Sequence, residues 1–132
     1  MIVADTNLLV YRSIETPFAP LAKRWFEVDP LWMVPTIWRF EFTNAIVMHV
    51  RKGVITRAEG ATAIDEAIKT YSSNEIVVDQ TTAFNLAMQL RLSAYDANFI
   101  LLAQALGTYC VTGDQQMLER APRWARGLLD FK

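Results

Sequence analysis

Short runs of consecutive apolar residues, each followed by polar ones, recur along this chain. Residues that are apolar at successive positions suit strands buried on both faces, as in a parallel sheet covered by helices. Four such runs occupy residues 2–4, 32–34, 76–78 and 109–111, and a weaker one lies at 128–129. The pattern predicts a buried sheet of four strands with a weaker fifth.

Longer stretches with apolar residues at helical spacing separate these runs. Thr16-Pro17 is typical of an N-cap followed by proline at the first helical position, and it predicts a helix that begins there. A second helix is predicted over residues 38–52, where Trp38, Phe42 and Ile46 share one face. Both helices lie between apolar runs, as the connections of a parallel sheet do.

Three more helices have recognisable start signals. Thr56 and Glu59 have the spacing of a capping box, which predicts a third helix. Asp79 can cap a fourth, and Ser93 opens a fifth that ends at Gly107. The apolar stripe predicted for the fourth helix comprises Phe84, Ala87, Met88 and Leu92. Strands that alternate with helices predict an α/β fold with a parallel sheet and right-handed crossovers.

The composition describes one globular domain. A chain of 132 residues has the length of a single domain and can bury a core without disulfides. With 52% hydrophobic and 20% charged residues, it is neither disordered nor of low complexity. Because no linker, internal repeat or charge block interrupts it, residues 1–132 are interpreted as one domain.

Cysteine use and hydropathy bear on the compartment. The single cysteine, Cys110, excludes an internal disulfide and a Cys-rich zinc site, and it fits a reducing environment. No apolar run reaches the ~18 residues that a membrane helix needs. The apolar start of the chain lacks a basic segment and meets Asp5 at once, unlike a secretory signal. We therefore expect a cytoplasmic protein with no membrane segment.

Four carboxylates lie where a parallel sheet binds its ligands, beyond the carboxyl ends of the strands. Asp5 follows the first apolar run and Asp114 follows the fourth. Glu41 lies within two turns of the start of the second helix, and Asp96 lies in the first turn of the fifth. The sequence therefore predicts that four acids from distant segments meet at one edge of the sheet.

Three of these acids also have an interpretation without chemistry. Asp5 and Asp114 suit turns, and Asp114 can also cap a short helix. Asp96 follows Ser93 by three residues, a capping-box-like pattern in which the acid only stabilises the helix start. For Asp96 alone, the capping interpretation is the stronger one.

Glu41 is the hardest acid to explain as a structural residue. It lies between Phe40 and Phe42 in the most aromatic part of the chain, where an unpaired acid is costly to bury. Asn44, three residues on, shares its helical face and can orient it. This environment favours a chemical role for Glu41.

Clustered acids repel one another unless a cation lies between them. With oxygen ligands only, no cysteine in reach and one histidine in the chain, the metal is expected to be hard, Mg²⁺ or Mn²⁺ rather than zinc. Such a site positions a phosphate and makes hydroxide from bound water. Setting the four acids aside leaves ten acidic residues against 13 basic ones, so the remaining surface is available to a nucleic-acid backbone.

Taken together, these motifs resemble those of the PIN-domain ribonucleases, and most closely the VapC-type toxins of prokaryotic toxin–antitoxin pairs. Each motif is weak alone, but their order and spacing are specific, and the resemblance spans nearly the whole chain. The motifs that carry it are Asp5-Thr6-Asn7, Glu41 with Asn44, Ser93-Ala94-Tyr95-Asp96-Ala97 and Thr112-Gly113-Asp114.

The resemblance implies a fold, an activity and partners. The implied fold is a three-layer α/β/α sandwich with a central parallel sheet in the order 3-2-1-4-5. The implied activity is RNA cleavage that depends on Mg²⁺ or Mn²⁺. A homodimer is implied too, together with a cognate antitoxin protein whose tail enters the active-site groove.

The family's acidic quartet matches this sequence residue by residue. Asp5, Asp96 and Asp114 are expected to hold the metal, and Glu41 to bind or orient the attacking water, with a second, weaker metal as an alternative. Relatives that use a further acid after the last one would hold a second metal better, but here Gln115 follows Asp114 directly. Supporting roles around the carboxylates or the phosphate are expected for Thr6, Asn7, Asn44 and Thr112.

Two other functions remain open from the sequence. The first is a different Mg²⁺-dependent phosphoryl-transfer domain. A phosphatase of the haloacid-dehalogenase type would need an acid at the position of Asn7. A phosphoacceptor domain could use Asp79, but it would also need a lysine after a late strand. The other is a PIN-like module that binds RNA or a partner without cutting. The intact acidic quartet favours the nuclease.

Overall fold

The structure, a computed structural model, describes residues 1–131 and has one five-stranded parallel sheet in the order β3-β2-β1-β4-β5. The strands are β1 (Ile2–Ala4), β2 (Trp32–Pro35), β3 (Glu75–Ile76), β4 (Cys110–Thr112) and β5 (Ala125–Gly127). The helices are α1 (Thr6–Ser13), α2 (Ala19–Val28), α3 (Trp38–Arg51), α4 (Arg57–Tyr71), α5 (Gln80–Leu90), α6 (Ala94–Leu106) and α7 (Gln115–Arg120), with a 3₁₀ turn η1 (Ser72–Asn74). The predicted α/β class and strand order are confirmed.

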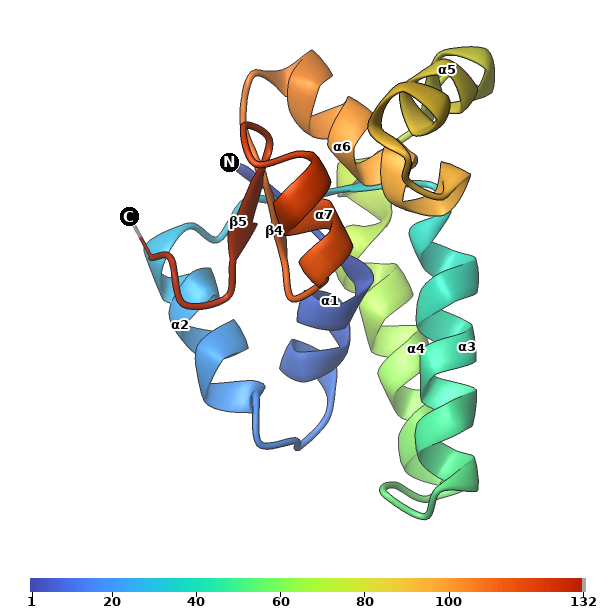
Figure 1. Cartoon of the computed structure of the whole chain (residues 1–132). Helices are drawn as coiled ribbons and strands as arrows, with labels where there is room; N and C mark the ends of the chain where they lie inside the picture. Colours follow the sequence, from blue (N-terminus) through green and yellow to red (C-terminus); the bar gives the residue numbers. More distant parts are fainter. Residues whose placement is uncertain (132) are drawn as a thin grey trace.

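Helices cover both faces of the sheet. α5 and α6 pack together on one side, and α1 to α4 gather on the other (Figure 1). α7 packs along β5 at the edge of the sheet. The central strands β1 and β4 are completely buried, as continuous apolar strands of a covered parallel sheet must be. Their carboxyl ends therefore open between the two helical layers.

Three tryptophans are the largest fully buried side chains of the core. Trp25, Trp32 and Trp38 are fully buried, and each indole N–H finds an acceptor. Burying an indole removes a large apolar area from water, but its N–H must keep a hydrogen bond to avoid a desolvation cost. None of the helices within residues 1–131 is both long and apolar enough to cross a bilayer.

The first helix of the structure was not predicted. α1 begins at Thr6, immediately after Asp5, whose carboxylate caps it by accepting from the Thr6 N–H. Leu8, Leu9 and Val10 are consecutive and all buried, so the apolar residues of this segment do not show a helical period. A strand that passes into a helix without a loop also offers no turn signal.

The start of α2 was predicted two residues too early. α2 begins at Ala19 with Phe18 at the N-cap and no side-chain cap, and Pro20 is the proline of its first turn. Thr16 instead accepts from the N–H of Phe18 in a local turn. A Thr-Pro pair is compatible with both a helix start and a turn. Here Thr16-Pro17 forms the turn, and Pro20 lies in the first turn of the helix.

The two edge strands also differ from prediction. β3 ends at Ile76, and Val77, at 81% exposed, lies outside the sheet. The expected fifth strand at 128–129 lies instead at Ala125–Gly127, and Leu129 is exposed. An edge strand has one neighbouring strand and is less buried than a central strand. An apolar run therefore predicts the bounds of an edge strand less precisely.

The stripe predicted for α5 was partly wrong. Ala83 and Ala87 are its buried residues, whereas Phe84 and Met88 are 59% and 68% exposed. α5 packs closely on α6, and small residues permit that approach. The predicted caps at Thr56, Asp79, Ser93 and Gly107 are confirmed.

Candidate active site

Asp5 lies at the carboxyl end of β1 and is the most buried of the four acids, at 7% exposed. Its Oδ1 accepts from the Thr6 N–H at 2.8 Å, and its Oδ2 accepts from the Thr112 hydroxyl at 2.5 Å. Thr112 ends β4, the strand beside β1. Asp5 is therefore fixed by the two central strands of the sheet.

Thr112 also orients the last acid of the quartet. Its side-chain oxygen accepts from the Asp114 N–H at 2.9 Å, while the same hydroxyl donates to Asp5. Asp114 in turn caps α7 by accepting from the Met117 N–H at 3.0 Å. One buried hydroxyl thus ties the Asp5 carboxylate to the backbone that carries Asp114.

Glu41 reaches the site from the first turn of α3. Its Oε1 accepts from the Thr6 hydroxyl at 2.8 Å, and its side chain is partly buried. Thr6 is therefore bonded on both sides: its N–H donates to Asp5 and its hydroxyl donates to Glu41. This pair of bonds joins α3 to the end of β1.

Asp96 lies in the first turn of α6, where its own N–H donates to the Ser93 hydroxyl at 3.0 Å. The cap is thus formed by the Ser93 side chain and the Asp96 backbone. The charge of Asp114 raises the pKa of Asp96 in addition to the larger effect of burial. A hydrogen bond between the Asp96 side chain and Ser93 acts in the opposite direction and lowers this pKa. Asp96 thus takes part in the helix cap and also feels the charge of Asp114.

The electrostatics link all four carboxylates. Burial raises the pKa of Asp5 to about 7, and the charges of Glu41 and Asp96 add to the rise, against the hydrogen bonds from Thr112 and Thr6. Burial also raises the pKa of Glu41, with Asp96 contributing. The pKa values of Asp5, Glu41 and Asp96 are thus each raised by the charge of at least one other site acid, as expected for acids that lie in one region.

The cluster lacks a cationic side chain. The ion pairs among residues 1–131 join Met1 to Asp29, Arg39 to Glu75 and Lys69 to Asp65, and none of them uses a site acid. Uncompensated buried carboxylates are destabilising unless they take up protons or a cation. The negative charge of the site therefore favours the binding of a cation.

The chemical type of the candidate ligands suits a hard divalent ion, because every one of them is a carboxylate oxygen. Within the described part of the chain, no three acidic, histidine or cysteine side chains stand close enough together to share a metal ion. A bound ion would therefore have to draw the carboxylates inward. Asp5, Asp96 and Asp114 are the residues that could hold it, with Glu41 beside them.

Two of the predicted supporting residues form no hydrogen bond with the site acids in the described part of the chain. Asn7 and Asn44 are exposed, and the hydrogen bond that holds Glu41 comes from Thr6, not from Asn44. The helical spacing of Asn44 from Glu41 was correct, but Thr6 comes closer from the neighbouring helix α1. Thr6 and Thr112 contact the carboxylates directly.

Tyr11 is a neighbour of the site that sequence reasoning missed. The charge of Asp5 contributes to the raised pKa of Tyr11, after the larger effect of burial. No motif marked this residue, because α1 itself was not predicted. Its detection would have required recognising Asp5 as a helix cap as well as an acid.

The fold and the site together define an α/β domain with a parallel sheet and with Asp5 and Asp114 just after its two central strands. Comparison with known proteins agrees. No family profile matches the chain. It is 30% identical over 89 residues to Ribonuclease VapC3 of Pyrobaculum aerophilum, an alignment that covers 63% of this chain and 66% of that relative, just under two thirds of its length. The chain is therefore similar to a VapC-type ribonuclease, as its motifs led us to expect.

A solved structure shares the fold. The crystal structure of PAE2754 from Pyrobaculum aerophilum superposes with a TM-score of 0.75 over 96% of this chain and 83% of that one, at 16% sequence identity. At that identity the match bears on architecture alone. It agrees with the sheet order described above.

Proposed function

We propose that this protein is a Mg²⁺- or Mn²⁺-dependent endoribonuclease that hydrolyses phosphodiester bonds in RNA, acting in the cytoplasm as the toxin of a toxin–antitoxin pair. The observation that carries the proposal is that Asp5, Glu41 and Asp96 each have a pKa raised by burial and by the charge of another site acid, while no ion pair among residues 1–131 uses any of the four acids. The similarity to a relative named as a ribonuclease supports RNA as the substrate.

In this proposal the acids have distinct roles. Asp5, Asp96 and Asp114 would hold the divalent ion, directly or through water. When bound, the ion supplies Lewis-acid stabilisation of the phosphate and lowers the pKa of a bound water. No further acid follows Asp114 closely, since Gln115, Gln116 and Met117 come next, so a second ion would have few ligands of its own.

Glu41 is placed to take a proton from the attacking water. Thr6 engages its Oε1, which leaves Oε2 to accept a hydrogen bond from water. As the water oxygen forms its bond to phosphorus, the water's proton passes to Glu41. The scissile P–O bond breaks, and the departing oxygen takes a proton from solvent. Burial and the charge of Asp96 raise the pKa of Glu41, which strengthens it as a base.

The test is a cleavage assay on end-labelled RNA with the parent chain, Glu41→Gln and a matched control, Glu119→Gln, at an exposed position of α7. We expect the parent and the control to cleave with Mg²⁺ or Mn²⁺, EDTA to stop them, and Glu41→Gln to lose activity by ~10²-fold or more. Cleavage that persists after exhaustive chelation would contradict the metal-dependent mechanism.

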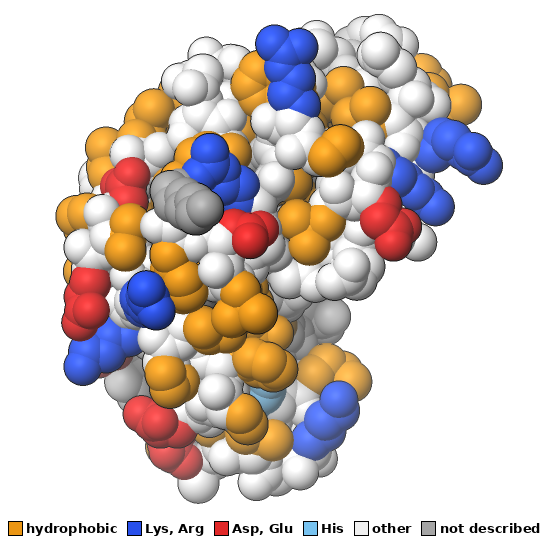
Figure 2. All heavy atoms as spheres, turned by 60° about the vertical axis from the view of Figure 1, so that its left-hand side comes forward, with side chains coloured by type: hydrophobic (Ala, Val, Ile, Leu, Met, Phe, Trp, Pro, Cys, Tyr) orange, Lys and Arg blue, Asp and Glu red, His pale blue; other side chains and the backbone are white. Residues whose placement is uncertain are grey.

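A protein partner is part of the same proposal. A groove of about 1060 Å³ lies between α1, α2 and the start of α4, with Ile14, Phe26 and Ile55 among its apolar lining. Figure 2 shows hydrophobic side chains gathered over the lower half of the face that carries α2. The acidic residues that line the groove are Glu15, Glu27, Glu59 and Glu66, against Arg12 and Lys23.

This groove suits an apolar protein segment flanked by lysine or arginine, and its excess of acids repels RNA. We therefore propose it as a docking site for the antitoxin. Copurification with the product of a neighbouring reading frame, and its loss in Glu27→Lys/Glu66→Lys, would test this assignment. Copurification of the double variant at parental yield would contradict it.

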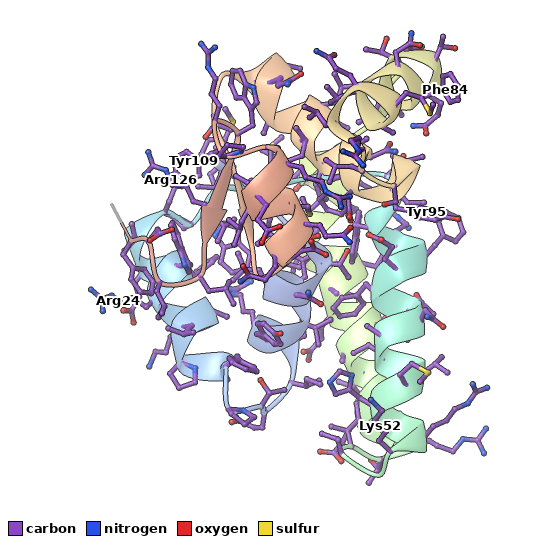
Figure 3. The ribbon with its side chains drawn as sticks, in the orientation of Figure 1. Arg24, Lys52, Phe84, Tyr95, Tyr109 and Arg126 are labelled. Carbon is purple, nitrogen blue, oxygen red and sulfur yellow. The ribbon has the colours of Figure 1, made fainter. Side chains whose placement is uncertain are left out.

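A homodimer is proposed from the exposed apolar residues on the opposite side. α5 carries no charged residue, yet Phe84 and Met88 are largely exposed. Phe84 and Tyr95 project outward on the same side of the molecule (Figure 3). Aromatic residues and methionine without charges are typical of protein interfaces, whereas RNA-binding surfaces are basic. This side therefore suits a second copy of the chain.

A further inference from the structure

Asn98 is a polar residue buried inside the α5–α6 contact. It is 4% exposed and lies between Ala97 and Phe99, both fully buried. Its Nδ2 donates to the carbonyl of Ala94 at 2.6 Å. Ala94 begins α6, so this bond spans the turn that carries Asp96.

Gln80, the first residue of α5, meets Asn98 with a reciprocal pair of amide bonds. Gln80 Nε2 donates to Asn98 Oδ1 at 2.7 Å, and Asn98 Nδ2 donates to Gln80 Oε1 at 3.3 Å. Gln80 Nε2 also donates to the carbonyl of Val78, just after β3. The first turn of α6 is thereby bonded to the start of α5 and to the chain that leaves the sheet.

The buried member of this pair, Asn98, is costly in a helix contact that could be wholly apolar, whereas Gln80 is exposed. Asparagine is a weak helix former. Each hydrogen bond that a buried amide does not form leaves its loss of hydration uncompensated and destabilises the fold. An apolar pair of the same volume would pack here in several registers. Two facing amides are satisfied in one arrangement only, so they fix the position of α6 relative to α5.

That position matters for the acidic site. Asp5 and Asp114 are set by the central sheet through Thr112. Asp96 has no such bond to the sheet, and its position relative to Asp114 depends on where the first turn of α6 lies. The Gln80–Asn98 pair holds that turn in place through Asn98, which is two residues after Asp96 in the sequence.

We propose that Gln80 and Asn98 are positioning residues that set the distance of Asp96 from the other acids, and with it the affinity of the site for a divalent cation. The inference rests on the proposed function, because it assigns Asp96 to the metal. It assigns Gln80 and Asn98 no contact with RNA.

The experiment titrates Mn²⁺ into the folded protein without RNA, by calorimetry, well below each melting temperature. The test variants are Asn98→Leu and Gln80→Met, which keep the shape and remove the amides. Their controls, Asn85→Leu and Gln89→Met, make the same changes at exposed positions of α5. We expect both test variants to bind Mn²⁺ ~10-fold or more weakly, as for other residues that orient metal ligands, and both controls to bind as the parent does.

A rescue variant separates positioning from packing. The exchange Gln80→Asn/Asn98→Gln keeps two amides and their combined length, so it should bind Mn²⁺ more tightly than Gln80→Met/Asn98→Leu. Should Asn98→Leu fail to fold, Gln80→Met decides the matter, because Gln80 is exposed and its loss leaves the fold intact.

The outcomes distinguish this inference from the proposed function. If the parent binds Mn²⁺ and cleaves RNA while Gln80→Met and Asn98→Leu match it in affinity, the positioning role is wrong and the nuclease assignment stands. If the parent binds no Mn²⁺, the proposed function fails and this inference falls with it.

Discussion

The Thr112 hydroxyl donates to Asp5 across the ends of two neighbouring strands, at 2.5 Å, and it is completely buried. Because the same oxygen accepts from the Asp114 N–H, one side chain fixes two of the four acids. A threonine before the last acid therefore belongs to the geometry of the site as much as the acids do.

Thr112→Val tests this relationship, since valine keeps the shape and removes the hydroxyl. The Asp5 carboxylate loses a bond that lowers its pKa, and the Asp114 N–H loses its acceptor. We expect cleavage to fall at least tenfold and its pH dependence to move upward, as Asp5 becomes harder to ionise. A pH–rate profile measures both effects.

The control for this variant is Thr108→Val, which removes a hydroxyl that donates to the Met1 carbonyl away from the acids. Its pH–rate profile should match that of the parent. An unchanged profile in a folded Thr112→Val protein would show that Thr112 does not control Asp5.

The raised pKa of Asp5 predicts how stability changes with pH. Its pKa is about 7 in the folded protein against 3.8 as the ordinary value, so the folded state holds the proton more tightly than the unfolded one. The resulting stabilisation is fully present below pH 3.8 and is lost as the pH rises through 7. For one such group it amounts to up to about 4 kcal/mol, before other titrations are added.

Melting temperatures from pH 4.5 to 8 measure this effect. Without metal, the parent should lose stability as the pH rises, and Asp5→Asn should show a shallower slope. Mg²⁺ should restore stability most at the high end of the range, where the carboxylates are ionised and bind it. A parent whose stability rises steadily with pH would contradict the burial of an uncompensated Asp5.

The sequence was most informative where the chain is most constrained. The central strands β1 and β4 are covered on both faces, so consecutive apolar residues marked them, and the acids at their ends followed from the topology. The edge strands and α5 are half-exposed, and there the apolar pattern misplaced Val77 and Phe84. Packing partners, which the sequence does not show, decide which side of such an element is buried.

The site shows the same division. The four acids were predicted, because each follows a strand or opens a helix. The bond from Thr6 to Glu41 was not, because it depends on α1, a helix with no detectable period. The Gln80–Asn98 pair also lies outside any motif, since it joins residues 18 apart whose amides meet only through the α5–α6 contact.

Asp96→Asn separates the two interpretations of that residue. The cap bond runs from the Asp96 N–H to the Ser93 hydroxyl, so asparagine retains it. Removing the charge should relieve repulsion with Asp114, and the metal-free variant should be as stable as the parent or more so. Cleavage should fall by at least ~10²-fold, and Mg²⁺ should raise the melting temperature less than in the parent. A folded Asp96→Asn protein that cleaves at the parental rate would remove this residue from the site.

The proposed homodimer is tested at its most exposed apolar residues. Phe84→Lys and Met88→Lys place a charge on a helix that carries none, and burying an unpaired ammonium against a second copy is strongly unfavourable. We expect each variant to sediment as a monomer at concentrations where the parent is a dimer. Val28→Lys, which replaces an exposed apolar residue on α2, is the control and should leave the dimer intact. Because Phe84 is 59% exposed, the monomer should remain folded, and its melting temperature should no longer rise with protein concentration. A parent that sediments as a monomer at high concentration would contradict the assignment of this side to self-association.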